Sequence, residues 1–353
     1  MHYIARVPHR PIALTAAALI TTALLGACGT APDPQPTFVA APSASAAAAS
    51  AVASPAASPS PAAAAAACGV FPADNVWRLD VSKLPVHASS AAYVRSIGAD
   101  AHMHPDFGSG LWEGAPIGIP VTTVKPGQAK VKVTFEYAGE SDKGPYPVPA
   151  DAKVEGGRGS DGDRHVILYD PAACKVYELY AAYPNGSGWR AGSGAIFDLR
   201  SNRLRPAGWT SADAAGLSVF AGLVRYDEIA KGRIDHALRI TVPRSRDTYL
   251  WPARHAASDR SDASLPPMGL RLRLKAGVDV SKFPKQARIV AEAMKTYGVI
   301  VADNGSPWYL SGAPDERWSN DALRALKDLQ GSDFEAVDVG KLAGDRDSGA
   351  VAR

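Results

Sequence analysis

The sequence has few cysteines, few aromatic residues and no strong charge of either sign. Its 353 residues include 3 cysteines, 8% aromatic residues and a formal net charge of +3 at pH 7. So small an excess does not provide the basic face that nucleic-acid binding requires. We therefore expect no nucleic-acid partner.

Several common catalytic motifs are also absent from the sequence. There is no Gly-x-Ser-x-Gly elbow, no His-Glu-x-x-His zinc motif and no phosphate-binding loop. Ser193 lies between two glycines but lacks the flanking pattern of a hydrolase nucleophile. These absences exclude the usual templates of serine hydrolases, zinc peptidases and P-loop nucleotide hydrolases, and no internal repeat is present.

Long hydrophobic runs are missing too, because the most apolar stretch, residues 12–25, is too short to span a bilayer comfortably. Arg6 and Arg10 precede it without any acid, which is the pattern of a signal peptide. The run is followed by Gly26-Ala27-Cys28, and this sequence resembles the lipobox of bacterial lipoproteins. That resemblance implies a signal peptide over residues 1–27 and a lipidated, palmitate-bearing Cys28.

The lipobox resemblance also implies a location. Gly29 stands where an Asp would favour retention at the inner membrane, so a lipid anchor in the outer membrane of the cell envelope is expected. The alternative is a soluble secreted protein with Cys28 as a spare thiol. Residues 29–67 are mostly Ala, Pro, Ser and Thr with Asp33 as the only charge, which predicts a disordered tether.

The two remaining cysteines are Cys68 and Cys174. In an oxidising compartment an even pair of this kind predicts a disulfide, here one that closes a loop of about a hundred residues. Two cysteines so far apart in sequence are poor candidates for a metal site. Removal of the signal peptide takes two arginines and no acid from 38 basic and 35 acidic residues, which leaves 36 and 35.

Residues 68–340 are long enough for one domain with a full core, and residues 341–353 read as a flexible tail. β-branched and aromatic residues between turn signals predict strands at 130–137, 165–169, 175–182, 194–199, 236–242, 270–274 and 299–302. Helical patterns cover 211–218, 223–230, 285–297 and 320–329. The fold class predicted is mainly β, an antiparallel sandwich or barrel with several helices, α+β overall.

A first candidate site is the run His102-Met103-His104-Pro105-Asp106. On an extended backbone His-x-His spacing places both imidazoles on one side, and Asp106 could complete a divalent metal site. The alternative is that both histidines are surface or packing residues. No other cofactor is predicted.

A second candidate site is an acidic, glycine-rich stretch that ends at a strand. Glycoside hydrolysis needs two carboxylates, one protonated and one ionised. The carboxylates in this stretch that could supply them are Glu140, Asp142, Glu155 and Asp163, with His165 as a further catalytic candidate and Tyr146 as a substrate-binding one. The alternatives are solvated loop acids or structural calcium ligands.

Two further segments carry candidate residues. His236 and Arg239 lie on a predicted strand, where a histidine is often only a hydrogen-bonded core residue. Trp251, Arg254 and His255 combine an aromatic platform with a guanidinium and an imidazole. We predict catalytic roles for His236 and His255, and substrate binding by Arg239, Trp251 and Arg254.

The run Asp303-Asn304-Gly305 is typical of a structural turn, and we expect only that role unless Asp303 proves buried. Together with the Gly208-Trp209-Thr210-Ser211 and Asp235-His236-Ala237-Leu238-Arg239 runs, it resembles a family of uncharacterised secreted bacterial domains. That resemblance covers most of residues 68–340 and implies a secreted single domain, with no activity or catalytic residue attached.

These patterns predict an exported, lipid-anchored protein that acts on a glycan or another cell-envelope polymer, as a polysaccharide hydrolase or lyase. The alternative is a non-catalytic carbohydrate-binding or structural lipoprotein of the envelope. One observation separates the two classes. Two acids that converge beside a Trp or Tyr in one cleft would favour the enzyme.

Overall fold

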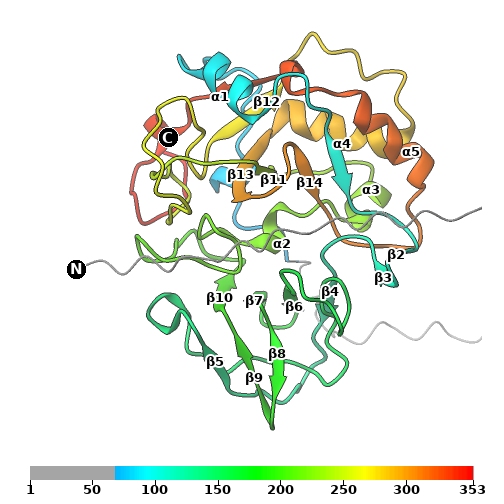
Figure 1. The fold of residues 1–353 in the computed structure, drawn as a ribbon, viewed down its shortest axis with the longest axis vertical. Helices are drawn as coiled ribbons and strands as arrows, with labels where there is room; N and C mark the ends of the chain where they lie inside the picture. The colour runs from blue at the N-terminus through cyan, green and yellow to red at the C-terminus, as the bar shows by residue number, and fades with distance from the viewer. Residues whose placement is uncertain (1–67, 353) are drawn as a thin grey trace, which may run out of the picture. The chain divides into compact units, whose positions relative to one another are not determined.

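A computed structural model describes residues 68–352 of the chain. The predicted signal peptide, Cys28 and the tether up to residue 67 lie outside the described residues. The described part contains 15 strands in four sheets and five short helices, and it forms no closed barrel (Figure 1). The prediction of a mainly β fold with several helices is confirmed.

The largest sheet has six strands in the order β1-β14-β11-β13-β12-β15. It is mixed rather than wholly antiparallel, because β1 pairs in parallel with β14 and β11 pairs in parallel with β13. The bounds are β1 His104–Asp106, β11 Leu238–Val242, β12 Arg271–Leu274, β13 Val299–Asn304, β14 Tyr309–Ser311 and β15 Phe334–Val337.

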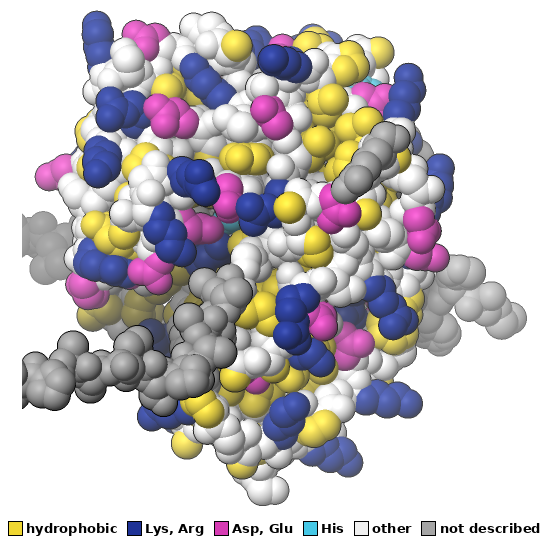
Figure 2. Space-filling view, turned by 180° about the vertical axis from the view of Figure 1, so that it is seen from behind, with side chains coloured by type: hydrophobic (Ala, Val, Ile, Leu, Met, Phe, Trp, Pro, Cys, Tyr) yellow, Lys and Arg dark blue, Asp and Glu magenta, His cyan; other side chains and the backbone are white. Residues whose placement is uncertain are grey.

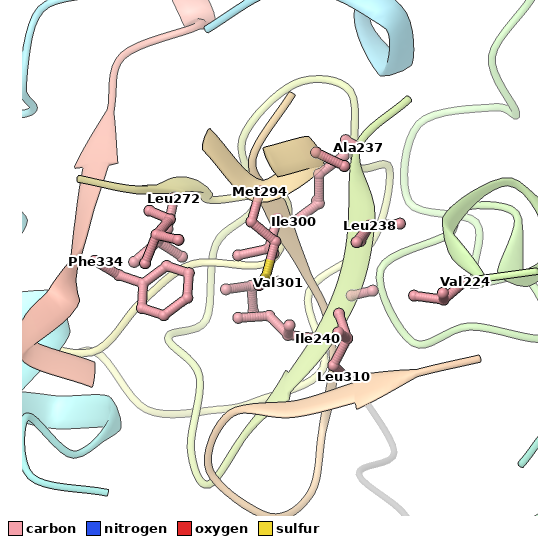
Figure 3. Packing of buried hydrophobic residues seen from close by; sticks show 14 of the residues in the cluster. Val224, Ala237, Leu238, Ile240, Leu272, Met294, Ile300, Val301, Leu310 and Phe334 are labelled. Atoms are coloured by element: carbon pink, nitrogen blue, oxygen red, sulfur yellow. The ribbon is translucent and has the colours of Figure 1, made fainter. Parts of the chain in front are cut away.

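Helices pack beside this sheet. They are α1 Ser90–Ile97, α2 Val219–Gly222, α3 Tyr226–Ala230, α4 Lys285–Thr296 and α5 Asn320–Arg324. The apolar stripe predicted at 285–297 is confirmed as α4, whose Val290 and Met294 are fully buried. Met294 meets Leu238, Ile300 and other sheet residues in the main hydrophobic core (Figure 3).

A second group of strands lies below the six-stranded sheet in Figure 1. A four-stranded sheet has the order β10-β7-β6-β4, a three-stranded sheet has the order β5-β9-β8, and β2 and β3 form a small hairpin. The bounds are β2 Leu111–Trp112, β3 Ala115–Pro116, β4 Val121–Thr123, β5 Val133–Phe135, β6 Val166–Asp170, β7 Lys175–Tyr180, β8 Tyr183–Asn185, β9 Gly188–Ala191 and β10 Ser193–Asp198.

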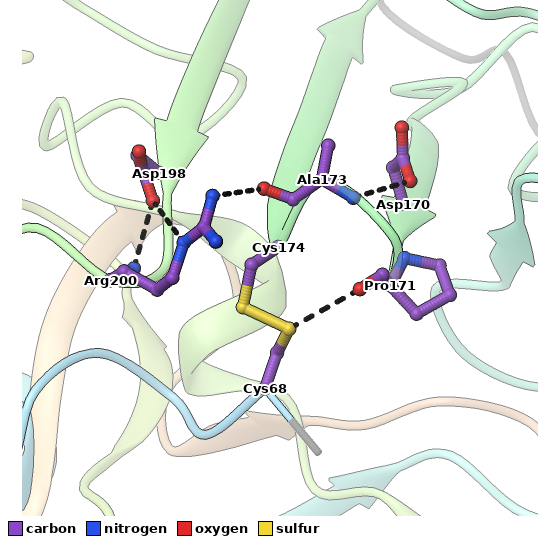
Figure 4. The surroundings of a disulfide bond; sticks show 7 residues. All are labelled: Cys68, Asp170, Pro171, Ala173, Cys174, Asp198 and Arg200. Atoms are coloured by element: carbon purple, nitrogen blue, oxygen red, sulfur yellow. Dashed lines mark hydrogen bonds and ion pairs between the residues drawn. A yellow bond between two sulfur atoms is a disulfide. The ribbon is translucent and has the colours of Figure 1, made fainter. Parts of the chain in front are cut away.

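The hairpin predicted around residues 169–174 is confirmed as the antiparallel pair β6–β7. Asp170 accepts a hydrogen bond from the backbone N–H of Ala173 and so stabilises the turn. Cys174, at the start of β7, forms the predicted disulfide with Cys68 (Figure 4). The first described residue is therefore covalently joined to the second group of strands.

The helix predicted at 211–218 is wrong. Ser211 does accept a hydrogen bond from the N–H of Asp213, as a capping residue would, but its own hydroxyl donates to the carbonyl of Leu217 and the segment forms turns. The helix begins later, because Ser218 is the residue that caps α2. Polar groups that favour a helix start serve a compact loop here.

The C-terminal residues predicted as a flexible tail are part of the domain. Ser348 and Ala350 form bridges with Arg203 and Asn75, respectively. Ser348 also accepts a hydrogen bond from the indole of Trp251. These contacts tie the end of the chain to segments far away in sequence.

Basic and acidic side chains are interspersed over the face of the molecule shown in Figure 2, which has no extended field of one sign. Within residues 68–352 no helix has both the length and the apolar character needed to cross a bilayer.

Candidate functional site

A row of polar residues crosses the six-stranded sheet at one level. Asp106 on β1 pairs with Ser311 on β14, and the hydroxyl of Ser311 accepts a hydrogen bond from Arg239 on β11. Arg239 is almost fully buried and makes a bidentate ion pair with the fully buried Asp213, with N···O distances of 2.8 and 3.1 Å. The row therefore runs from an exposed carboxylate to a buried ion pair.

A second row, from the four-stranded sheet, faces the first. His165 lies directly before β6 and beside Tyr180 at the end of β7, with ring centroids 5.9 Å apart. The Nδ1 atom of His165 lies 2.6 Å from the carboxylate of Glu155. The charge of Arg239 acts on the pKa values of both His165 and Glu155, so the two rows form one electrostatic system.

His165 is a buried cation. Its Nδ1 faces the carboxylate of Glu155, and its Nε2 lies 2.9 Å from the carbonyl oxygen of Ala212. Since both partners accept hydrogen bonds, both ring nitrogens must carry protons. Burial lowers the pKa of His165, but Glu155 and then Asp163 outweigh that effect and raise it to about 9.

Glu155 is held in its ionised form. Burial raises the pKa of its carboxyl, but the charge of His165 and two hydrogen bonds from that residue outweigh burial, and the net pKa is lowered. The side chain keeps 26% of its surface exposed. It is therefore an anion that a bound ligand can reach.

Glu155 and Asp106 line the same cleft, whose volume is about 1180 Å³. Tyr309 and His104 stack on each other in the wall of the cleft with ring centroids 4.2 Å apart. Trp112, on the β2–β3 hairpin, also lines the cleft and is 71% exposed. Asp106 and Glu155 are thus two of the four acids, with Glu113 and Asp161, that line this cleft beside aromatic side chains.

Asp106 differs from Glu155 in its titration. Removal of water around it raises the pKa of its carboxyl, the charge of Glu155 raises it further, and His104 and Arg239 oppose the rise without cancelling it. Asp106 therefore holds its proton more tightly than an ordinary carboxyl does, whereas Glu155 holds its proton less tightly. Opposite shifts of this kind separate an acid from a base or nucleophile.

Asp303, at the end of β13, lies at the other side of Arg239, with 3.9 Å between carboxylate oxygen and guanidinium nitrogen. Burial and the charge of Asp213 raise the pKa of Asp303 to about 7, against the effect of Arg239. Its side chain is 25% exposed. Asp303 is therefore half-buried beside Arg239 rather than fully buried.

The predicted residues fall into three places, and the first is the pair of rows described above. It brings together Asp106, Glu155, His165 and Arg239, and the charge of Asp163 acts on His165 from the same region. Asp106 was predicted as a metal ligand. Its place in the cleft makes it a candidate general acid.

A second place gathers predicted residues around Arg205. Its guanidinium contacts the carboxylate of Asp142 and the carbonyl of Glu140. The carboxylate of Glu140 accepts from the N–H of Thr210 and lies 3.9 Å from His255. Tyr146 is buried and donates its hydroxyl to the carbonyl of Asp142, and the catalytic and substrate-binding roles predicted for these residues stay predictions.

The third place is a set of internal contacts. His236 is fully buried, with Nε2 2.9 Å from Glu228 and Nδ1 2.7 Å from the carbonyl of Ala237. Arg254 contacts Asp347 in the C-terminal segment, to which Trp251 also bonds. Roles in catalysis or substrate binding for these three predicted residues remain predictions.

The metal site predicted at His102, His104 and Asp106 is not formed. No group of three or more His, Cys, Asp or Glu side chains within residues 68–352 could hold a metal ion. The ring of His102 contacts the carbonyl of Lys327 at 2.7 Å, whereas His104 stacks on Tyr309. His102 bridges to Gln330 whereas His104 pairs with Tyr309, so the two histidine rings contact different neighbours.

Sequence analysis missed Asp213, Trp112 and Tyr309. Asp213 lies in the segment predicted as a helix at 211–218, and its pairing with Arg239 has no local signal. Trp112 sits beside Leu111, and two neighbouring exposed apolar residues on a short hairpin were a signal that could have found it. Tyr309 was read only as part of a turn.

Comparisons of the chain with models of protein families, with curated proteins and with solved structures found no match.

Proposed function

We propose that the protein is a glycan-directed hydrolase in which Asp106 acts as general acid and Glu155 as nucleophile or base. The observation that supports this most directly is the convergence of these two carboxyls in one cleft with opposite pKa shifts. Cleavage of a glycosidic bond needs one carboxyl that donates a proton and one that is already ionised.

The rest of the cleft suits a sugar polymer. Trp112 and Tyr309 offer aromatic faces for sugar rings, and Asn320 and Arg324 add polar groups for hydroxyls. The protonated Asp106 would donate to the leaving glycosidic oxygen, and Glu155 would attack the anomeric carbon or activate a water. The positive charges of His165 and Arg239 lower the pKa of Glu155 and so keep it ionised.

The cellular setting is part of the proposal. Acylation of Cys28 would anchor the protein to the outer membrane, and residues 29–67 would give the domain reach toward an envelope or extracellular polymer. Two or three acyl chains make a stable anchor, whereas one chain does not. The domain would then act on glycans within the range of its tether.

The test is to incubate the full-length protein with neutral polysaccharides, acidic polysaccharides and peptidoglycan. New reducing ends report hydrolysis, and unsaturated-uronate absorbance reports lyase action. We expect hydrolysis by the wild type and a loss of about 100-fold or more in Asp106→Asn and Glu155→Gln. Asp151→Asn, an exposed acid that does not line the cleft, is the matched control and should keep full activity.

Each other outcome has a meaning. Full activity in both cleft variants would overturn the assignment of Asp106 and Glu155. Unsaturated products would replace the hydrolase with a lyase. Glycan binding without any cleavage would favour the non-catalytic carbohydrate-binding protein.

A further inference from the structure

A second cleft, of about 800 Å³, lies between β4, α3 and the first described residues. Its lining includes Cys68, Val121 and Thr123 of β4, and Tyr226 of α3. None of the residues that line it also lines the first cleft. It is therefore a separate hollow.

Each carboxylate of this second cleft is paired with an arginine. Asp235 pairs with Arg78 at 2.8 Å, and Glu228 pairs with Arg225. The other two, Asp227 and Asp315, share Arg317, at 2.9 and 2.6 Å. Four carboxylates thus share three arginines, so one negative charge of the second cleft is not cancelled by an arginine.

Three cations of the second cleft remain available. Lys153, Lys231 and Arg233 line it, are exposed, and make no side-chain hydrogen bond or ion pair to another residue within 68–352. These three cations outnumber the single carboxylate charge that the arginines leave over, so the excess charge of the cleft is positive. An anionic ligand would be favoured there.

An aromatic wall accompanies these cations. Tyr169 stacks on Phe220 with ring centroids 5.1 Å apart, and Arg225 lies over the Phe220 ring at 4.5 Å. All three residues line the second cleft. A partly apolar wall in a cleft that also carries positive charge is suited to a ring that bears a carboxylate.

The two clefts are neighbours along three segments. Lys153 of the second cleft and Glu155 of the first are two residues apart, as are Pro120 and Gly118. The N–H of Asp315, in the second cleft, bonds to the carbonyl of Gly108, next to Phe107 of the first. The two clefts are therefore built in part from the same segments of the chain.

We infer that the second cleft binds a uronate residue of the same glycan that the first cleft cleaves, with Lys153, Lys231 and Arg233 around its carboxylate. This inference rests on the proposed function, because it assigns an acidic polymer as the substrate class. The aromatic wall would contact the face of the sugar ring. The enzyme would then select acidic over neutral chains at a distance from the reacting bond.

The first measurement is calorimetric binding of trigalacturonate and of neutral maltotriose to the full-length Glu155→Gln protein, which should not cleave them. We expect tighter binding of trigalacturonate, and a loss of about tenfold or more when Lys231→Gln and Arg233→Gln are combined. Lys282→Gln with Lys285→Gln removes the same charge from exposed positions outside both clefts and should change nothing. Inorganic phosphate is the competitor that identifies a general anion site.

The second measurement is cleavage kinetics of the double variant in the wild-type background. We expect a higher KM for acidic polymer with kcat retained, and no change for neutral polymer. Equal binding of the two trisaccharides, equal loss in the control variant, or full displacement by equimolar phosphate would overturn the inference. Uronate preference without any cleavage would instead overturn the proposed hydrolase and keep the anionic site.

Discussion

His165 and Glu155 form an ion pair of 2.6 Å at the meeting point of two sheets, with the histidine buried and the carboxylate partly open to a cleft. A second acceptor, the carbonyl of Ala212, fixes the other ring nitrogen. The histidine cannot act as a base while it holds both protons. Its role follows from its charge, which sets the protonation state of Glu155.

Replacement of His165 by Asn should therefore change the pH dependence of activity. The charge of His165 lowers the pKa of Glu155, so its removal raises that pKa and moves the acidic limb of kcat/KM to higher pH. The measurement is a pH–rate profile on the cleaved glycan. His87→Asn, a histidine of another region packed on Tyr93, should leave the limb in place; an unmoved limb in the His165 variant would refute the positioning role.

The protein should be less stable at alkaline pH, because His165 is buried as a cation. The pKa of His165 rises from 6.5 to about 9 on folding, so the folded protein binds the proton more tightly than the unfolded chain. This contribution, on the order of 3 kcal/mol, is fully present below pH 6.5 and is lost as the pH rises to about 9. Urea unfolding at pH 6 and pH 9.5 measures it, and His165→Asn should show a smaller difference between the two pH values.

The buried ion pair between Arg239 and Asp213 should be costly to break. Asp213→Asn leaves a buried guanidinium without its main counter-charge, and a loss of about 3 to 5 kcal/mol in the free energy of unfolding is expected. The matched control is Asp321→Asn, which breaks the exposed pair with Arg324 and should cost less than about 1 kcal/mol. Similar losses in the two variants would show that Arg239 finds other partners, with Asp303 the nearest.

Trp112 should matter for ligand binding but not for folding. Its side chain is 71% exposed on the β2–β3 hairpin, so Trp112→Ala should leave the melting temperature unchanged. Glycan affinity should fall about tenfold or more, as for other aromatic anchors of binding sites. Tyr249→Ala, an exposed aromatic outside both clefts, is the comparison, and equal affinities in the two variants would exclude Trp112 from the binding site.

Local patterns predicted the elements whose stability is local. The β6–β7 hairpin and α4 were found because turn residues and an apolar stripe act over a few positions. The helix expected at 211–218 failed because the Ser211 hydroxyl closes a local loop through the carbonyl of Leu217, and Asp213 pairs with the distant Arg239. The parallel pairing of β11 with β13 had no local signal, since β12 and α4 lie between them in sequence.

In the candidate site, too, residue types could be predicted from the sequence but the contacts between them could not. His165, Glu155 and Arg239 were singled out by residue type, but their partners depend on the packing of two sheets against each other. Asp106 and Glu155 lie on different segments, and no spacing rule relates them. The opposite shifts of their pKa values arise from His165 and from burial, neither of which a single sequence reveals.

The disulfide between Cys68 and Cys174 has a mechanical consequence. A pull on the chain from the side of residue 67 reaches the domain at Cys68 and passes through the two sulfur atoms to the start of β7. Residues 69–173, which include Asp106, Glu155 and His165, carry none of that load while the bond is intact. Tension applied at Cys68 would leave the carboxylates of Asp106 and Glu155 in place, and reduction of the bond would direct the same force along the segment that holds them.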